Sequence, residues 1–176
     1  MRIIAGAYKG RTLKAPTWDG LRPTSDKLRE TLFNILAPRI EGARVLDLFA
    51  GTGAVALEAL SRGAAAATCV ERDPRAIKLI EANVARCGAN GCAIIRDDVQ
   101  RALQRPLPGR PFDIVVLDPP YDYAALESVI AGAVTQRGEG GVVILEHAAR
   151  VAPPAPGGFA PSRTVRSGDS ALTFYS

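Results

Sequence analysis

The sequence predicts an α/β fold: a mostly parallel β-sheet with helices on both faces, a terminal antiparallel hairpin and a short N-terminal extension. Three observations support this prediction. Short apolar runs alternate with helical patterns through the middle of the chain, which is the βαβ rhythm of a parallel sheet. A glycine-rich turn follows the first of these runs. The 176 residues, 47% of them hydrophobic, suit one domain with a substantial core.

An N-terminal segment precedes this alternation. Residues 2–5 and 11–14 are expected to be extended and to form a small ribbon. A helix follows, with Thr24 or Ser25 as its N-cap. Its apolar face consists of Leu28, Leu32, Ile35 and Leu36. Pro38 is expected to end this helix, because proline removes a backbone donor.

The alternating elements follow in order. The expected strands span 44–49, 66–71, 92–95, 112–117 and 141–146, and residues 164–166 and 171–175 form the terminal hairpin. The expected helices span 53–61, 74–87, 97–103 and 124–135. In the second of these helices, Asp73 is the predicted N-cap, Gly88 the predicted C-cap, and Ile77, Ile80, Val84 and Cys87 mark one face. The proline-rich stretch 150–161 is expected to be a loop, and we assign it no role.

The composition argues against several classes of protein. Cys69, Cys87 and Cys92 lack the pair spacing of a metal site, and His147 is the single histidine, so we expect no metal. No apolar run approaches the ~18 residues of a membrane span. Charged residues follow Met1 too closely for the hydrophobic region of a signal peptide. We therefore expect a cytoplasmic protein with reduced thiols and no membrane partner.

Basic residues concentrate near the N-terminus. The formal net charge of the chain is +4, and residues 1–42 account for all of it, so residues 43–176 are neutral. We therefore divide the chain into a basic extension with its helix (1–42) and one compact main domain (43–176). A basic segment on a neutral domain suggests a phosphate-rich partner, although a solvated basic face fits the same pattern.

The sequence Asp118-Pro119-Pro120-Tyr121 follows the apolar run 112–117. The prolines stiffen the segment and lack backbone N–H groups, so it offers acceptors: the Asp118 carboxylate and nearby carbonyls. Tyr121 adds an aromatic face. Such a corner suits a flat ring with an exocyclic amine, whose hydrogens two acceptors can bind while the ring stacks on the tyrosine. A packed proline turn without function is the simpler alternative.

The glycine turn after the first strand suggests a ligand site. Glycines at a strand-to-helix turn allow a ligand to approach the backbone and the helix N-terminus. The residues after the strand, Gly51 to Ala56, also fit the loose dinucleotide pattern. Asp47 argues against a dinucleotide, because it would repel a pyrophosphate and attract a cation. S-adenosylmethionine is positively charged at its sulfonium and ammonium groups and carries no phosphate.

Acids also end the next two strands. Glu71 is placed to accept both ribose hydroxyls, as an acid does in nucleotide-binding folds. Asp98 is our choice to bind the adenine amine and Asp97 to cap the next helix, although the two could exchange roles. The expected cofactor residues are Asp47, Phe49, Ala50, Gly51, Thr52, Gly53, Glu71, Arg72, Asp97, Asp98 and Val99.

In this order, the motifs resemble the class I S-adenosylmethionine-dependent methyltransferases, in the branch that methylates exocyclic amines. The N-terminal stretches 2–6, 9–11, 21–24 and 29–36 are similar to the bacterial 16S rRNA guanine-N2 methyltransferase family (ribosomal small subunit methyltransferase D). The resemblance covers nearly the whole chain. It implies a Rossmann-like, seven-stranded sheet with its last strands antiparallel. It also implies an N-terminal extension that engages RNA.

The resemblance therefore predicts methyl transfer from S-adenosylmethionine to the N2 amine of a guanine in 16S rRNA, either free or in an assembling small subunit. The expected catalytic residues are Asp118, Pro119, Pro120 and Tyr121. The expected RNA contacts are Arg2, Lys9, Arg11, Arg22 and Thr24, although Arg22 and Thr24 also suit capping, surface or cofactor roles. We expect a monomer.

Four alternative functions fit parts of the sequence. An adenine-N6 methyltransferase shares the Asp-Pro-Pro-Tyr motif but usually needs a larger target-recognition region. A protein glutamine methyltransferase normally has asparagine at the position of Asp118. An NAD-dependent oxidoreductase conflicts with Asp47 and with the Asp-Pro-Pro-Tyr motif. A non-catalytic RNA-binding module would be expected to lack key acids, whereas Asp47, Glu71 and Asp118 are all present.

Overall fold

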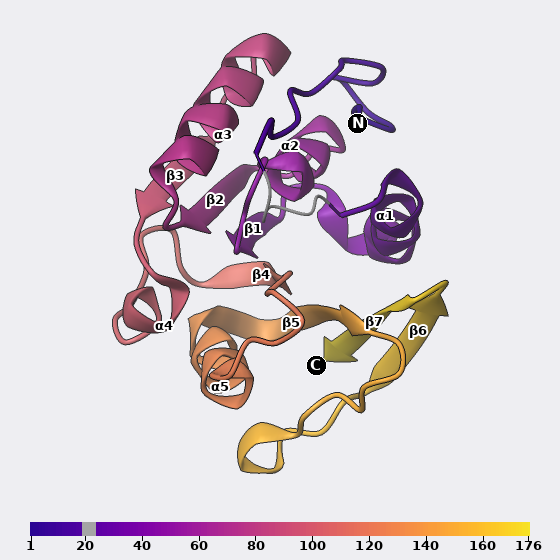
Figure 1. The fold of residues 1–176 in the computed structure, drawn as a ribbon, viewed down its shortest axis with the longest axis vertical. Helices are drawn as coiled ribbons and strands as arrows, with labels where there is room; N and C mark the ends of the chain where they lie inside the picture. Colours follow the sequence, from indigo (N-terminus) through magenta and orange to yellow (C-terminus); the bar gives the residue numbers. More distant parts are fainter. Residues whose placement is uncertain (19–23) are drawn as a thin grey trace.

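A computed structural model describes residues 1–18 and 24–176 (Figure 1). The strands are β1 (Arg44–Leu48), β2 (Ala66–Glu71), β3 (Cys92–Arg96), β4 (Phe112–Leu117), β5 (Arg137–Ala148), β6 (Arg163–Ser167) and β7 (Ser170–Tyr175). The helices are α1 (Asp26–Ile40), α2 (Ala54–Ser61), α3 (Pro74–Cys87), α4 (Val99–Ala102) and α5 (Leu126–Gln136), with a short 3-10 helix, η1 (Pro156–Gly158).

The strands form one seven-stranded sheet in the order β3-β2-β1-β4-β5-β7-β6. Strands β1 to β5 run parallel, and β7 pairs antiparallel with both β5 and β6. This confirms the expected mostly parallel sheet with a terminal antiparallel hairpin. The chain moves outward from β1 to β3 and then returns to β4 on the other side of β1. In α/β sheets, ligands bind outside the carboxyl ends of the strands at such a switch point.

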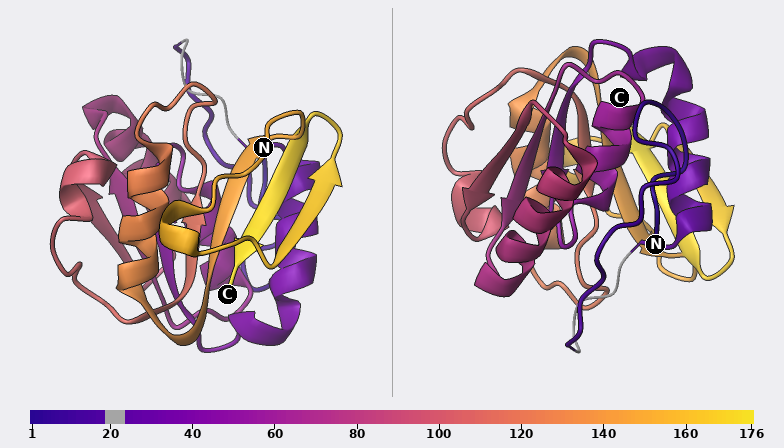
Figure 2. Two further views of the ribbon diagram at one scale, coloured as in Figure 1. Left: turned by 90° about the horizontal axis from the view of Figure 1, so that it is seen from below. Right: turned by 90° about the horizontal axis from the view of Figure 1, so that it is seen from above.

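Helices cover both faces of the sheet (Figure 1). One core lies under α1, α2 and α3 and contains Phe33, Val55 and Ile80. The other lies under α4 and α5 and contains Val99 and Ile130. Figure 2 shows α1 beside the yellow β6–β7 hairpin, in agreement with the buried residues that they share in the first core.

The N-terminal segment forms the expected ribbon. Arg2 and Thr12 make an antiparallel bridge, and the Leu13 N–H donates to the Met1 carbonyl at 3.1 Å. The ribbon packs on α2 and α3 through the buried side chains of Ile3 and Leu13. The division of the chain at residue 42 stays a prediction.

Helix α1 begins after Ser25, whose hydroxyl accepts a hydrogen bond from the Leu28 N–H. The expectation that Pro38 ends the helix is wrong, because the helix continues to Ile40. A proline in the last turn removes only one hydrogen bond, and the burial of Ile40 in the core favours the extra residues.

Helix α3 has the predicted caps. The Asp73 carboxylate accepts from the Arg75 N–H, and Gly88 adopts the left-handed conformation with φ 54°. Its buried face is rotated from the predicted one, because Ala76 and Leu79 are buried while Ile77 is only half-buried. Helix α4 is shorter than expected, and β5 begins earlier, at Arg137, across an irregularity in its pairing with β4.

The proline-rich stretch 150–161 covers the end of β7. Tyr175 is fully buried, and its hydroxyl donates to the Pro154 carbonyl at 2.8 Å. Phe159 stacks on the Tyr175 ring with centroids 6.1 Å apart. Burial raises the pKa of Tyr175 to about 12. The stretch therefore shields an aromatic side chain of the core.

Among the helices of residues 1–18 and 24–176, none has the length and apolar character needed to cross a bilayer.

Candidate active site

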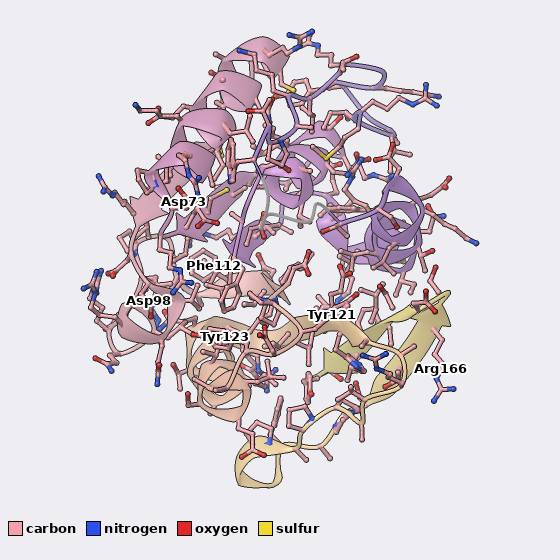
Figure 3. All side chains as sticks on the ribbon, viewed as in Figure 1. Asp73, Asp98, Phe112, Tyr121, Tyr123 and Arg166 are labelled. Carbon is pink, nitrogen blue, oxygen red and sulfur yellow. The ribbon has the colours of Figure 1, made fainter. Side chains whose placement is uncertain are left out.

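A cavity of about 590 Å³ lies at the carboxyl ends of the parallel strands. It brings together the predicted catalytic and cofactor residues except Gly53, although they are far apart in the sequence. Each of the five parallel strands contributes at least one acid to its lining, in or just after the strand: Asp47 (β1), Glu71 (β2), Asp97 and Asp98 (after β3), Asp118 (after β4) and Glu146 (β5). Figure 3 shows Asp73 and Asp98 on one side of the sheet edge and Tyr121 on the other.

The glycine turn between β1 and α2 is tightly wound. Phe49 has a positive φ of 64°, a conformation that costs of order 1–3 kcal/mol in a non-glycine residue and is concentrated at functional sites. Gly53 is left-handed at the N-cap of α2, and a Cβ there would approach Ile80 to 3.0 Å. Gly53 therefore allows α3 to pack closely against the turn rather than lining the cavity.

Asp47 is a buried acid at the centre of the cavity. It is 2% exposed, and its Oδ2 accepts the Ala56 N–H at 3.2 Å. Burial raises the pKa of Asp47 well above its ordinary value, and the Asp118 and Glu71 carboxylates add to the rise, while the bond from Ala56 opposes it. Such an environment favours an approaching cation, which relieves both the desolvation and the repulsion.

Glu71 holds the glycine turn to the end of β2. Its Oε2 accepts the Gly51 N–H at 2.9 Å, and its Oε1 accepts the N–H groups of Arg72 and Asp73 at 2.8 and 2.9 Å. Each carboxylate oxygen has two lone pairs, so Oε1 is fully used and Oε2 can still accept from one ligand hydroxyl. Glu71 is thus a rigid acceptor beside the glycine turn.

The N-cap of α4 is the second of the two acids after β3, not the first as preferred. Asp98, not Asp97, caps α4, since its Oδ1 accepts the Gln100 N–H at 3.0 Å. Asp97 instead binds Arg105 and Arg101, which hold the pKa of its carboxyl below the ordinary value. The capping part of our prediction is therefore wrong. A cap depends on which side chain points at the first turn, and adjacent acids look alike in a sequence.

The acceptor corner after β4, residues Asp118 to Tyr121, has side-chain contacts at both of its ends. The Thr24 hydroxyl donates to Asp118 Oδ2 at 2.6 Å. Tyr121 is 49% exposed, and its hydroxyl is 3.0 Å from that of Ser170, in the hairpin between β6 and β7. The Pro120 carbonyl accepts the Tyr123 N–H, which closes the turn. The corner therefore presents a carboxylate beside an accessible aromatic ring.

The sequence matches the family described as "Conserved hypothetical protein 95" over residues 1–176. The chain belongs to this family. It is 45% identical over 130 residues to the Ribosomal RNA small subunit methyltransferase D of Escherichia coli, covering 74% of this chain and 65% of that protein. The aligned part is thus slightly under two thirds of that relative. The protein of the same name from Haemophilus influenzae is 38% identical over 133 residues, covering 74% and 69%.

Solved structures agree with this family membership. The Escherichia coli protein yhhF superimposes with a TM-score of 0.86 at 37% identity, covering 99% of this chain and 96% of that one. An RNA methyltransferase from Salinibacter ruber, 19% identical, has a TM-score of 0.70 over 88% and 92% of the two chains, and this likeness concerns the fold alone. The expected Rossmann-like methyltransferase fold is confirmed.

The residues predicted to contact RNA lie in different settings in this family member. Arg2 and Lys9 are exposed on the ribbon. The Arg11 guanidinium donates to the Cys87 carbonyl and lies 5.2 Å from the Tyr8 ring centroid, so it also anchors the ribbon to α3. Thr24 lines the cavity and binds Asp118, which differs from a contact on the outer surface. Arg22 lies outside the described residues.

Sequence reasoning missed several residues of the cavity. Glu146 ends an apolar run just as Asp118 does, and this signal could have identified it. Trp18 lines the cavity, with the Arg75 guanidinium 5.0 Å from its ring centroid. Asp169 and Ser170 reach the site from the terminal hairpin. No local pattern marks these last three, because the packing of distant segments brings them to the cavity.

Proposed function

We propose that this protein transfers a methyl group from S-adenosylmethionine to the exocyclic N2 amine of a guanine in 16S rRNA. The observation that carries the proposal is the single cavity that joins a cation-favouring pocket at Asp47 to the acceptor-rich corner at Asp118 and Tyr121. The names of the Escherichia coli and Haemophilus influenzae relatives support an rRNA substrate.

The cofactor half of the cavity fits the proposed methyl donor. Asp47 attracts the positively charged methionine end, Gly51 and Thr52 offer the turn at the N-terminus of α2, and Glu71 Oε2 accepts from one ribose hydroxyl. Asp98 and Val99 line the same cavity where the adenine ring is expected. When bound, S-adenosylmethionine supplies an electrophilic methyl group on a positively charged sulfur.

The acceptor half of the cavity activates a weak nucleophile. The lone pair of a guanine N2 amine is delocalised into the ring. Asp118 and the Pro119 carbonyl bind the amine hydrogens, which favours a pyramidal nitrogen with its lone pair directed at the methyl. As the N–C bond forms, the bond between sulfur and the methyl carbon breaks and its electron pair stays on sulfur, which becomes neutral. The nitrogen becomes acidic, and its proton passes to Asp118 or to water. Positioning and the negative charge near the developing positive charge supply most of the rate.

Tyr121 and Glu146 bind the base in this proposal. The exposed Tyr121 ring stacks on the base, an interaction worth ~1–3 kcal/mol. Leu145 of β5 pairs with Leu117 of β4 in the parallel ladder. Glu146 and Asp118 are the residues that follow this pair on the two strands. Glu146 is 7% exposed and lines the cavity. A carboxylate there accepts the N1–H of guanine, whereas adenine has an acceptor at N1.

The basic N-terminal segment contacts phosphates through Arg2 and Lys9 in this proposal, with Arg11 contributing charge beside its role in the ribbon. We also propose that the enzyme works as a monomer in the cytoplasm, on rRNA of an assembling small subunit.

The test is to replace Asp118 by asparagine and to measure cofactor binding and methyl transfer separately. Transfer to small subunits from cells lacking the protein should fall at least about 100-fold, while the Kd for S-adenosylmethionine stays within a few fold. Undiminished transfer would contradict the role of Asp118. Nucleoside analysis that finds N6-methyladenosine instead would favour an adenine-N6 enzyme.

A further inference from the structure

The hydroxyl of Thr24 makes a direct contact with the proposed catalytic carboxylate. Its Oγ1 donates to Asp118 Oδ2 at 2.6 Å, between residues 94 positions apart in the chain. Both side chains line the same cavity. A short hydrogen bond to a charged acceptor is among the stronger polar interactions in proteins, and it fixes the plane of the carboxylate. The contact therefore bears directly on how the carboxylate faces the amine of the substrate.

The start of α1 holds Thr24 in a defined place. Ser25, the next residue, caps the helix by accepting the Leu28 N–H at 3.1 Å, and its carbonyl accepts the Arg29 N–H at 3.0 Å. The helix packs on the sheet through buried side chains such as Phe33, which is 1% exposed. As a β-branched residue, Thr24 has few χ1 rotamers. Its hydroxyl is therefore presented from a packed element.

The same helix is hydrogen-bonded to the N-terminal ribbon. The fully buried Arg29 guanidinium donates to the Arg2 carbonyl at 2.6 Å and lies 3.7 Å from Glu58. Glu58 in turn accepts the N–H groups of Ile4 and Ala5 at 2.8 and 3.0 Å. The contacts of Arg29 and Glu58 therefore connect the ribbon, α1 and α2. Thr24, which contacts Asp118, lies at the start of α1 and so next to this connected unit.

We propose that Thr24 is a positioning residue for methyl transfer: it holds the Asp118 carboxylate in the orientation that accepts the amine. The inference rests on the proposed function, since it gives a role to a contact of that site. Removing the hydroxyl takes away a 2.6 Å contact that fixes the plane of the Asp118 carboxylate, so the carboxylate should meet the amine less often in the productive orientation. In this inference Thr24 acts through Asp118 and not directly on the methyl group or the amine.

The experiment compares Thr24→Val, which removes the hydroxyl but keeps the shape, with Thr24→Ser, which keeps the hydroxyl. Thr31→Val is the matched control, since Thr31 lies on the same helix and donates to the Lys27 carbonyl on its exposed side. Single-turnover methylation of unmodified small subunits is measured together with the Kd values for S-adenosylmethionine and for the particle. Melting temperatures show whether each variant is folded.

Thr24→Val should slow the single-turnover rate about 10–100-fold, the range for losing a hydrogen bond to a charged group, with both Kd values within about twofold. Thr24→Ser should recover the rate to within about threefold, and Thr31→Val should match the wild type. In an Asp118→Asn background, Thr24→Val should have little further effect, because the two residues act as a unit.

Three outcomes would overturn the inference. The first is an unchanged rate for Thr24→Val. The second is an equal loss for Thr24→Val and Thr24→Ser, which would indicate a packing role. The third is a loss confined to particle affinity, which would assign Thr24 to RNA binding. If the wild type methylates no rRNA at all, the proposed function fails and this inference fails with it; an active wild type separates the two cases.

Discussion

The buried pair Arg29 and Glu58 makes the strongest stability prediction. Both side chains are fully buried, and Arg29 Nε lies 3.7 Å from Glu58 Oε2. Arg29 Nε and Nη1 have no hydrogen-bond partner within residues 1–18 and 24–176, so Glu58 compensates this side of the guanidinium, while Asp26 Oδ1 lies 3.0 Å from Nη2. Glu58 also pairs with Arg62 at 2.7 Å. Replacing Glu58 by alanine would leave a buried cation poorly compensated and would remove the acceptor for Ile4 and Ala5.

Breaking one side of a buried ion pair costs about 3–5 kcal/mol. For a domain of this size, a loss of about 4 kcal/mol lowers Tm by roughly 8–16 °C. Since domains are stable by about 5–15 kcal/mol, Glu58→Ala should remain folded at room temperature. The free energy of unfolding is measured by urea denaturation, and the midpoint should fall while the slope m stays near that of the wild type.

The matched control is Glu81→Ala, because Glu81 is exposed on α3, and its effect should stay within about 0.5 kcal/mol. Adding Arg29→Met to Glu58→Ala should restore part of the stability, since it removes the uncompensated charge. A loss below about 1 kcal/mol for Glu58→Ala would refute the reasoning, as would a double variant that is no more stable than Glu58→Ala.

Three further predictions concern the cavity and the ribbon. Because folding raises the pKa of Asp47, the contribution of this carboxyl to the free energy of unfolding should fall as pH rises from about 4 through the raised pKa, and the comparison of the wild type with Asp47→Asn isolates it. Asp47→Asn should therefore raise the free energy of unfolding at neutral pH while weakening S-adenosylmethionine binding at least about tenfold, and unchanged calorimetric affinity would count against the cofactor role. Glu146→Gln should reduce the preference for guanine over 2-aminopurine by about tenfold in single-turnover assays, because 2-aminopurine has an N2 amine but an acceptor at N1. Glu139→Gln, on the exposed part of β5, is the control. An unaltered ratio of the two rates would exclude Glu146 as the N1–H acceptor. Replacing Arg2 and Lys9 by glutamine should reduce the slope of log affinity for rRNA against log salt by up to about 2, and a constant slope would make them a solvated face.

Much of the fold and half of the site were predictable because their signals are local. The caps Asp73 and Gly88 bracket α3 as expected, since capping depends on residues next to the helix. Acids directly after buried strands were recognisable at Asp47, Glu71 and Asp118, because the carboxyl ends of parallel strands share one edge. The end of α1 was not predictable, since burial of Ile40 outweighs the local effect of Pro38.

The sequence by itself determined the order of strands and helices along the chain, the family and several of the acids that line the cavity, because periodicity, caps and motifs depend on neighbours along the chain. Only the tertiary structure decided how the acceptor corner is supported. The contacts of Thr24 with Asp118 and of Ser170 with Tyr121 join residues 94 and 49 positions apart. Such contacts exist because α1 and the terminal hairpin pack beside the end of β4, and packing between distant elements leaves no pattern in either segment.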